Sequence, residues 1–251
     1  MAGEEQAVAL VTGGAGGLGS AICRKLADAD FRVVVGYNRS AHGAQQLASS
    51  LAGQGHSARL ATVTASAQLA SLASGIGKDY GRCDVLVNCA GITRFVRHGD
   101  LEAIDDGLID NILATNVRGA FAAVRAFRPL LEKSPLPGGG VVVNLSSAAA
   151  TLAMGSNVIY CASKAALDNM TKSLARALAP RIRVVSVSPA LVDTEFVKSM
   201  DRGWRDEQAA RSPLGRLATP EEVANAVVAA ITTLTFATGS ILLVDGGRSL
   251  A

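Results

Sequence analysis

The sequence has few of the residues on which metal centres and disulfide-bonded proteins depend. It contains 4 cysteines and 3 histidines among 251 residues. The cysteines show no spacing typical of metal ligands, and free buried thiols are the simplest interpretation. The histidines are scattered over expected loops and edges. We expect no metal site, no disulfide and no acid–base role for the histidines. The residues concerned are Cys23, Cys83, Cys89, Cys161, His42, His56 and His98.

Charge of one sign and long apolar runs are also missing. The net charge is +3 and no run of Lys or Arg stands out, so nucleic acid is not an expected partner. No apolar stretch approaches the roughly 20 residues that cross a bilayer, so no membrane association is expected. Residues 1–6 are acidic and lack the apolar core of a signal peptide. These absences predict a cytoplasmic protein.

The chain does have apolar residues in a regular order. Hydrophobic residues make up 49% of it, and short apolar runs alternate with stretches of helical period. This alternation predicts an α/β fold, a doubly wound parallel sheet (Rossmann fold) of about seven strands with helices on both faces. One domain is expected over residues 1–251. The expected strands lie near residues 7–11, 31–36, 57–62, 84–88, 140–145, 182–187 and 240–244.

Two segments between the expected strands are unusual. Residues 105–132 predict one long helix. Residues 134–140 are rich in Pro and Gly and resemble a linker. An apolar strand resumes directly after them, so we interpret them as a connection within the sheet and not as a domain boundary.

A glycine-rich turn follows the first expected strand. It runs from Thr12 to Gly19, and an amphipathic stretch then continues to about Ala29. A dinucleotide site needs this order, because glycine permits the tight turn and lets the pyrophosphate approach the positive end of a helix. The glycine spacing fits more than one fingerprint, so it does not identify the class of protein. A glycine turn that binds no nucleotide is the alternative.

Tyr160 and Lys164 lie at positions i and i+4 of an expected helix, and Ser147 precedes them. Residues so spaced share one helix face, and a nearby ammonium favours the phenolate form of a tyrosine. Enzymes that transfer hydride to a carbonyl need a proton donor, a cation that lowers the pKa of that donor, and a hydroxyl that hydrogen-bonds the carbonyl. An ordinary pair on a helix surface is the alternative.

Taken in order, these motifs resemble the short-chain dehydrogenase/reductase family in its common single-domain form. The resemblance covers essentially the whole chain and is greatest to the branch of 3-oxoacyl-carrier-protein reductases and broad carbonyl reductases. The matching residues are Thr12, Gly13, Gly17, Gly19, Asn88, Cys89, Ala90, Gly91, Asn116, Ser147, Tyr160, Lys164, Ser188, Pro189, Val192 and Thr194, with residues 220–224 and 244–247.

The resemblance implies a division of labour in the active site. In the reducing direction, Tyr160 donates a proton to the carbonyl oxygen and Ser147 hydrogen-bonds the same oxygen. Lys164 lowers the pKa of Tyr160 and binds the nicotinamide ribose. Asn116 holds a water that links Lys164 to solvent, or else it is a helix Asn that bonds to backbone. Asn88 braces the sheet beside the cofactor.

The resemblance also implies a set of cofactor contacts. Val63 and Ala90 are expected to flank the adenine, and Val192 and Thr194 to contact the nicotinamide carboxamide. The full set is Gly13, Gly17, Leu18, Gly19, Asn38, Arg39, Ser40, Val63, Asn88, Ala90, Gly91, Tyr160, Lys164, Pro189, Val192 and Thr194.

The end of the second expected strand favours NADP(H) as the cofactor. Enzymes that use NAD typically place a carboxylate there for the ribose 2′-hydroxyl, and this chain has none. Arg39 instead offers a planar donor array that suits a 2′-phosphate, and Asn38 and Ser40 add hydrogen bonds. Two departures from the family pattern weaken the case for NADP(H) over the NAD(H) alternative. The glycine turn carries no basic residue, and Thr62 replaces the Asp that usually contacts adenine.

Residues 195–216 resemble the variable lid over the substrate, with Phe196, Met200 and Trp204 as its large apolar residues. Trp204 either contacts substrate or holds the lid to the body. The leading substrate class is a small-molecule carbonyl or 3-oxoacyl compound. An acyl-carrier protein is possible but not favoured, because residues 137–140 lack the Arg expected for that acidic partner.

Two other functions stay open. One is an NAD-dependent dehydrogenase that oxidises a secondary alcohol, a sugar or a steroid. The other is a non-catalytic dinucleotide-binding protein. The resemblance further implies a homotetramer that pairs through the long helix, the Tyr160 helix and the C-terminal strand. Apolar faces at 120–127 and 167–174 fit such contacts, and they also fit core packing.

Overall fold

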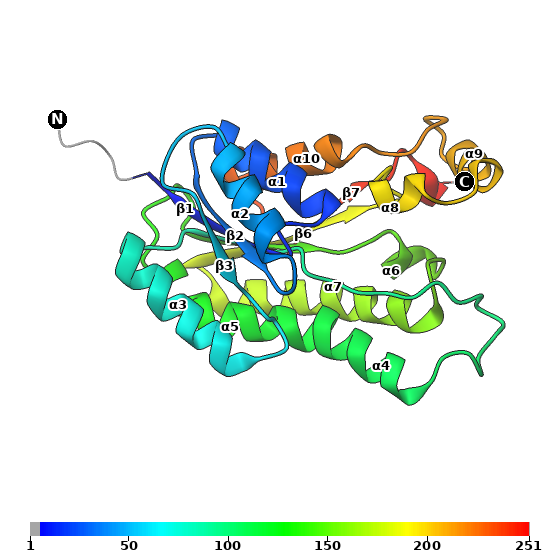
Figure 1. Ribbon diagram of the computed structural model, residues 1–251, viewed down its shortest axis with the longest axis horizontal. Coiled ribbons are helices and arrows are strands. Elements are labelled where there is room, and N and C mark those ends of the chain that lie inside the picture. Colours follow the sequence, from blue (N-terminus) through cyan, green and yellow to red (C-terminus); the bar gives the residue numbers. More distant parts are fainter. Residues whose placement is uncertain (1–5, 251) are drawn as a thin grey trace.

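A computed structural model of the chain describes residues 6–250 and contains a seven-stranded parallel sheet in the order β3-β2-β1-β4-β5-β6-β7 (Figure 1). The strands are β1 Val8–Thr12, β2 Arg32–Tyr37, β3 Ser57–Leu60, β4 Val85–Asn88, β5 Gly140–Leu145, β6 Ile182–Pro189 and β7 Ile241–Val244. All seven expected strands are confirmed. The four central strands are buried along their whole length, whereas β3 and β7 at the edges are mostly not. Continuous apolar runs form central strands because helices cover both faces of a parallel sheet.

Helices cover the two faces in two sets (Figure 1). One set is α1 Gly17–Asp28, α2 Ala41–Ser50 and α10 Pro220–Thr232, and the other is α3 Ser66–Tyr80, α5 Ala120–Leu131 and α7 Val158–Leu178. Each set packs on its own apolar core, one of which includes Ile22 and Val227 and the other Phe127 and Leu178. The expected doubly wound architecture is therefore confirmed.

The long helix expected over 105–132 is interrupted in its middle. The structure has α4 Asp106–Leu113, a π-helical segment η1 Ala114–Gly119, and α5. Asp105 caps α4 by accepting from the amide of Leu108 at 2.7 Å. The helical period could not show the π-helical segment, because the apolar pattern continues across it. π-Helical turns often occur at functional sites, and this one carries Asn116.

The remaining short elements gather beyond the carboxyl ends of the strands, at the right of Figure 1. They are α6 Ala149–Leu152, α8 Glu195–Lys198, α9 Arg202–Ala210 and the 3-10 helix η2 Arg248–Leu250. Residues 132–139 connect α5 directly to β5. Within residues 6–250, none of the helices has the length and apolar character that a bilayer crossing needs. The side chain of Phe196, expected in the lid, lies outside the described part.

Candidate active site

The glycine turn between β1 and α1 is shaped by close backbone approach. Gly13 has φ +66°, and a Cβ there would lie 2.9 Å from the Cα of Ala90. A Cβ on Gly19 would collide with the carbonyl oxygen of Gly13. Larger residues at these two positions would therefore displace the chain. The Gly14 amide donates to Gly36 at 2.8 Å and fixes the turn against β2.

The N-terminus of α1 offers a site for an anion. Its N-cap residue, Gly16, makes no side-chain cap, and the first turn contains no acidic residue. The first amides of a helix have no partner within the helix, and the helix dipole adds positive charge there. The residues present fit a pyrophosphate, which supplies the missing acceptors and the negative charge.

A hollow of about 500 Å³ lies over this turn. Ten expected cofactor residues line it, namely Gly13, Gly17, Leu18, Gly19, Asn38, Arg39, Ser40, Val63, Ala90 and Gly91. It is also lined by residues that were not among the expected cofactor contacts, namely Ala15, Gly16, Tyr37, Ala61, Thr64, Cys89, Ile92 and Thr115. Most of these adjoin a selected residue in sequence, so adjacency to the motifs was the available signal. Thr115 likewise adjoins Asn116, and the π-helical segment carries both residues.

The end of the hollow that follows β2 is polar and carries one charged side chain, Arg39. Arg39 is exposed, and no acidic residue is among the described residues that line the hollow. The Thr62 hydroxyl donates to the Oδ1 of Asn38 at 2.9 Å. This bond fixes the orientation of the Asn38 side-chain amide. Thr62, which replaces the usual Asp, therefore orients a side chain of the hollow without lining it.

Tyr160 and Ser147 meet beyond the ends of the strands. Their hydroxyl groups are hydrogen-bonded, and the Oγ of Ser147 also accepts from the amide of Ala149 at 3.2 Å. Removal from water raises the pKa of Tyr160, and the hydrogen bond with Ser147 opposes that rise. The neighbouring Ser146 is turned away, with its hydroxyl directed at the carbonyl oxygen of Lys164. The structure thus brings Ser147, and not Ser146, to the phenol.

Lys164 lies under the Tyr160 ring, with its Nζ 5.6 Å from the ring centroid. The Nζ donates to the carbonyl oxygen of Leu145 at 2.6 Å. Burial lowers the pKa of Lys164 to about 8. Burial raises the pKa of Tyr160 and Lys164 is not among the groups that shift it in this structure, so the expected lowering of this pKa by Lys164 stays a prediction. The ammonium is directed at a backbone carbonyl instead of the phenol.

Asn116 is buried in the π-helical segment and bonds to the protein. Its Oδ1 accepts from the amide of Ile92 at 2.8 Å, and its Nδ2 donates to the Ile92 carbonyl at 3.0 Å and to the Ser163 hydroxyl at 3.1 Å. Two of these three bonds are to backbone, as in the alternative given above. A water relay to Lys164 stays a prediction.

Six of the expected cofactor residues do not line the hollow, and two of these, Tyr160 and Lys164, are described above. Asn88 is buried and donates to Asn144 at 2.9 Å, so it joins β4 to β5 as expected. Thr194 lies against the glycine turn, since a Cβ on Gly17 would be 3.5 Å from it. Its hydroxyl caps α8. The other two, Pro189 and Val192, lie at and just beyond the end of β6.

Residues 195–216, which are expected to form the lid, contact the rest of the chain through an aromatic pair and an ion pair. Trp204 of α9 meets the ring of Phe95 edge-on, with 6.2 Å between centroids, and Phe95 belongs to the loop after β4. Arg205 pairs with Asp193 at 2.8 Å. Trp204 therefore holds the lid to the body, one of the two roles considered for it. Phe95 was missed because nothing in its local sequence relates it to residues so distant along the chain.

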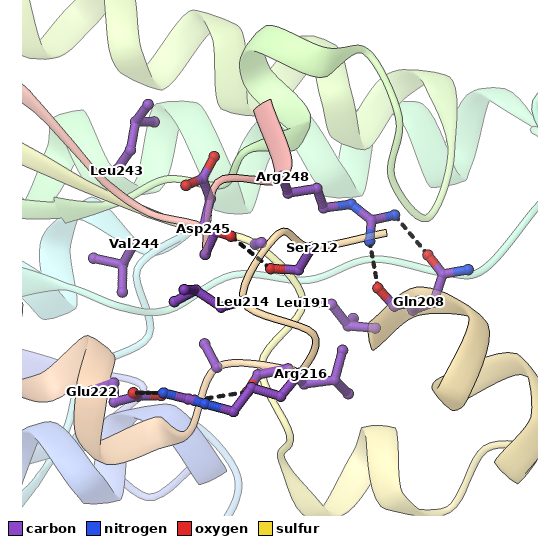
Figure 2. A pocket seen from close by; sticks show the side chains of 14 residues that line it. Leu191, Gln208, Ser212, Leu214, Arg216, Glu222, Leu243, Val244, Asp245 and Arg248 are labelled. Carbon is purple, nitrogen blue, oxygen red and sulfur yellow. Dashed lines mark hydrogen bonds and ion pairs between the residues drawn. The ribbon is translucent and has the colours of Figure 1, made fainter. Parts of the chain in front are cut away.

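A second cavity of about 190 Å³ lies behind the lid (Figure 2). Figure 2 shows Arg248 reaching Gln208, to whose carbonyl and side-chain oxygens it donates at 2.8 and 2.7 Å. Ser212 donates to the carbonyl of Gly246 at 2.8 Å. None of the expected site residues lines this cavity. These contacts fix the rear of the lid to the segment after β7.

Comparisons with known proteins agree with this geometry. Residues 13–249 match a family described as enoyl-(acyl carrier protein) reductase. The chain is 37% identical over 248 residues to a protein of Streptomyces violaceoruber named as a ketoacyl reductase of the granaticin polyketide synthase, covering 98% of this chain and 97% of that one. It is 36% identical over 249 residues to D-threitol dehydrogenase of Mycolicibacterium smegmatis, covering 97% and 93%. A solved 3-ketoacyl-(acyl-carrier-protein) reductase of Brucella melitensis, complexed with NADH, superposes with a TM-score of 0.87 at 30% identity, covering 98% and 99%.

Proposed function

Because this chain belongs to the short-chain dehydrogenase/reductase family of oxidoreductases, we propose that it reduces a ketone to a secondary alcohol with NADPH. The family uses a nicotinamide dinucleotide. The observation that carries the proposal is the hydrogen-bonded pair of Tyr160 and Ser147, with Lys164 beneath the tyrosine ring. An ordinary helix-surface pair does not require a buried lysine, whose ammonium costs free energy to remove from water.

The bound dinucleotide supplies the hydride. The glycine turn and the N-terminus of α1 would hold its pyrophosphate, with Gly13, Gly17 and Gly19 permitting the approach. Val63 and Ala90 would lie beside the adenine, and Thr194, next to Gly17, would face the nicotinamide end. The remaining expected contacts, including Lys164, complete the site.

Tyr160 would act as the proton donor. In the reducing direction a carbonyl oxygen gains negative charge, and the Tyr160 hydroxyl gives it a proton while Ser147 donates a hydrogen bond to it. A raised pKa keeps the phenol protonated and ready to donate. Lys164 supplies positive charge beneath the ring, which stabilises the phenolate that remains. Asn116 bonds to Ile92, which lines the dinucleotide hollow, and so holds the start of the loop after β4.

The preference for NADPH over NADH is supported by Arg39. It is the one charged residue among the described residues that line the hollow, and it suits a 2′-phosphate better than a 2′-hydroxyl. The second candidate is an NAD-dependent dehydrogenase acting on a secondary alcohol. The similarity to D-threitol dehydrogenase, and to a reductase solved with NADH, favours that candidate.

We propose a small-molecule or 3-oxoacyl carbonyl as the substrate. Two basic residues that would serve an acyl-carrier protein are already engaged, Arg128 with Glu132 at 2.7 Å and Arg125 with Ser66 at 3.2 Å. Their engagement weighs against that acidic partner. Residues 195–216 would form a lid on a single domain. A homotetramer in the cytoplasm stays a prediction, and the exposed Phe121 on α5 supports pairing through that helix.

The proposal is tested by measuring NADPH and NADH oxidation against β-keto thioesters, β-keto esters, diketones and cyclic ketones. Turnover with NADPH is expected, and the best substrate identifies the class. Turnover only in the oxidising direction with NAD, on polyols or cyclic alcohols, would favour the second candidate. Binding of cofactor without turnover of any ketone or alcohol would favour a non-catalytic protein.

A further inference from the structure

Asn157 is the residue that begins the helix carrying Tyr160, and it is fully buried, with 0% of its surface exposed. Its Oδ1 accepts from the amide of Tyr160 at 2.7 Å, which caps α7. Its Nδ2 donates to the carbonyl oxygen of Arg94 at 2.7 Å and to the hydroxyl of Thr93 at 3.2 Å. One side-chain amide therefore bonds both to the proposed proton donor and to the loop after β4.

These bonds fix which end of the amide faces Tyr160. The two acceptors, at Arg94 and Thr93, require the NH₂ group on the loop side, so the oxygen must face the helix. A buried amide with both ends bonded is held in one orientation, because an unpaired polar group in the interior costs free energy. Asn157 is thus a rigid connection between the loop and the first turn of α7.

The loop that Asn157 contacts joins the two halves of the candidate site. Its start, Ile92, lines the dinucleotide hollow and is held by Asn116, and its Phe95 meets Trp204 of the lid. Next to Asn157, the carbonyl of Ser156 accepts from the amide of Val96 at 2.8 Å. The loop is therefore fastened at several points to the segment that precedes Tyr160.

We propose that Asn157 is a positioning residue for Tyr160, which holds the phenol against Ser147 and in register with the loop that borders the substrate. The proposal rests on the proposed function, in which Tyr160 is the proton donor. Asn157 bonds to the backbone amide of Tyr160 and not to its phenol, so its effect acts through the placement of Tyr160. Proton transfer is sensitive to such placement, because a displacement of about 1 Å can slow a reaction on the order of 100-fold.

Two variants separate the two bonds, and a third serves as a control. Asn157→Ala removes both the cap and the connection to the loop. Asn157→Ser keeps a hydroxyl acceptor, which caps helices about as well as Asn, but is too short to reach Arg94. Thr219→Ala is the matched control, since Thr219 caps α10 in the same way and α10 covers the opposite face of the sheet from α7 (Figure 1).

The first readout is steady-state reduction of the best ketone by NADPH. We expect Asn157→Ala to lower kcat about 10- to 100-fold and to leave the KM for NADPH within about twofold of the wild-type value. We expect Asn157→Ser to recover much of kcat. We expect the KM for the ketone to be raised in both Asn157 variants, because neither holds the loop. Thr219→Ala, assayed at the same interval below its own Tm, keeps the wild-type kcat.

The second readout needs no turnover. The chain has 3 tyrosines, and labelling with 3-fluorotyrosine gives a ¹⁹F signal for Tyr160 that Tyr160→Phe identifies. Lys164 under the ring and Cys161 beside it are the ionisable groups near the phenol, and all three variants retain them. In Asn157→Ala the first turn loosens and water reaches the phenol, so its titration moves to lower pH. Asn157→Ser titrates as the wild type does.

Two results would overturn the inference. One is an Asn157→Ala protein whose Tyr160 signal titrates as in the wild type. The other is a loss of kcat in Asn157→Ala no larger than in Thr219→Ala, which would make Asn157 an ordinary helix cap. A failure of the proposed function is recognised separately, as full turnover by Tyr160→Phe or as no turnover of any ketone by the wild type.

Discussion

The ammonium of Lys164 donates to the carbonyl oxygen of Leu145 at 2.6 Å, although the ring of Tyr160 lies above it. Burial is the main reason that the pKa of Lys164 falls to about 8. The unfolded chain, with a lysine pKa of about 10.4, then binds more protons at this residue than the folded chain does between these two values. Stability attributable to this residue therefore rises with pH across that window.

We expect Lys164→Met to lack this rise. The free energy of unfolding of the wild type, measured in urea from pH 7.5 to 10, should increase relative to that of Lys164→Met as the pH passes 8. Taking the difference between the two proteins removes the contributions of groups that they share. Two curves that stay parallel over this range would mean that Lys164 has an ordinary pKa in the folded protein.

Arg39 gives the second prediction, which concerns the cofactor. If it binds a 2′-phosphate, Arg39→Ala removes a charge-assisted hydrogen bond of about 1.5–3 kcal/mol, and kcat/KM for NADPH falls about 10- to 100-fold. The value for NADH stays nearly unchanged. Arg59→Ala is the control, because Arg59 lies on the edge strand β3 and pairs with Asp79 outside the hollow. Equal losses with both cofactors would show that Arg39 does not distinguish them.

The third prediction concerns stability, through Arg183. This buried side chain of β6 donates to the carbonyl oxygens of Ala230, Ile231, Leu234 and Ala237, at and beyond the end of α10. Arg183→Met leaves these carbonyls without the cation, and we expect a loss of about 3 kcal/mol in the free energy of unfolding. The exposed Arg181→Met is the comparison and should lose little. Equal urea midpoints for the two variants would contradict the capping role.

The cysteines give the fourth prediction. Burial raises the pKa of Cys89 to about 11 and that of Cys83 to about 12, and it also raises those of Cys23 and Cys161. At pH 8 the thiolate fraction of Cys89 is then about one in a thousand. We expect iodoacetamide to label the native protein slowly and the urea-unfolded protein at all 4 cysteines, as read by mass spectrometry. Rapid labelling of native Cys89, which lines the dinucleotide hollow, would contradict its raised pKa.

The strands were predictable because each is a short apolar run, and burial on both faces of the sheet demands such runs. The glycine turn was predictable for a similar reason, since only glycine fits at Gly13 and Gly19. The π-helical segment around Asn116 was not, because it depends on bonds to Ile92, which is far away in the sequence. The sequence pattern around Asn116 does not indicate a partner as distant as Ile92.

The candidate site shows the same division. The spacing of Tyr160 and Lys164 correctly brought them to one helix face, but it could not indicate that the ammonium would bond to Leu145. Asn157 was missed altogether. An Asn before a helix predicts a cap, but its bonds to Thr93 and Arg94 arise only when the loop after β4 folds over it.

The central claim is that Tyr160 donates the proton during reduction of a ketone by NADPH. The most direct test compares NADPH oxidation by the wild type and by Tyr160→Phe on the best ketone, with cofactor binding measured in parallel. This substitution keeps the aromatic ring and its packing and removes only the hydroxyl. The account predicts that Tyr160→Phe binds NADPH with nearly the wild-type Kd and loses turnover by at least about 1,000-fold. Turnover by Tyr160→Phe within a few-fold of the wild type would contradict it.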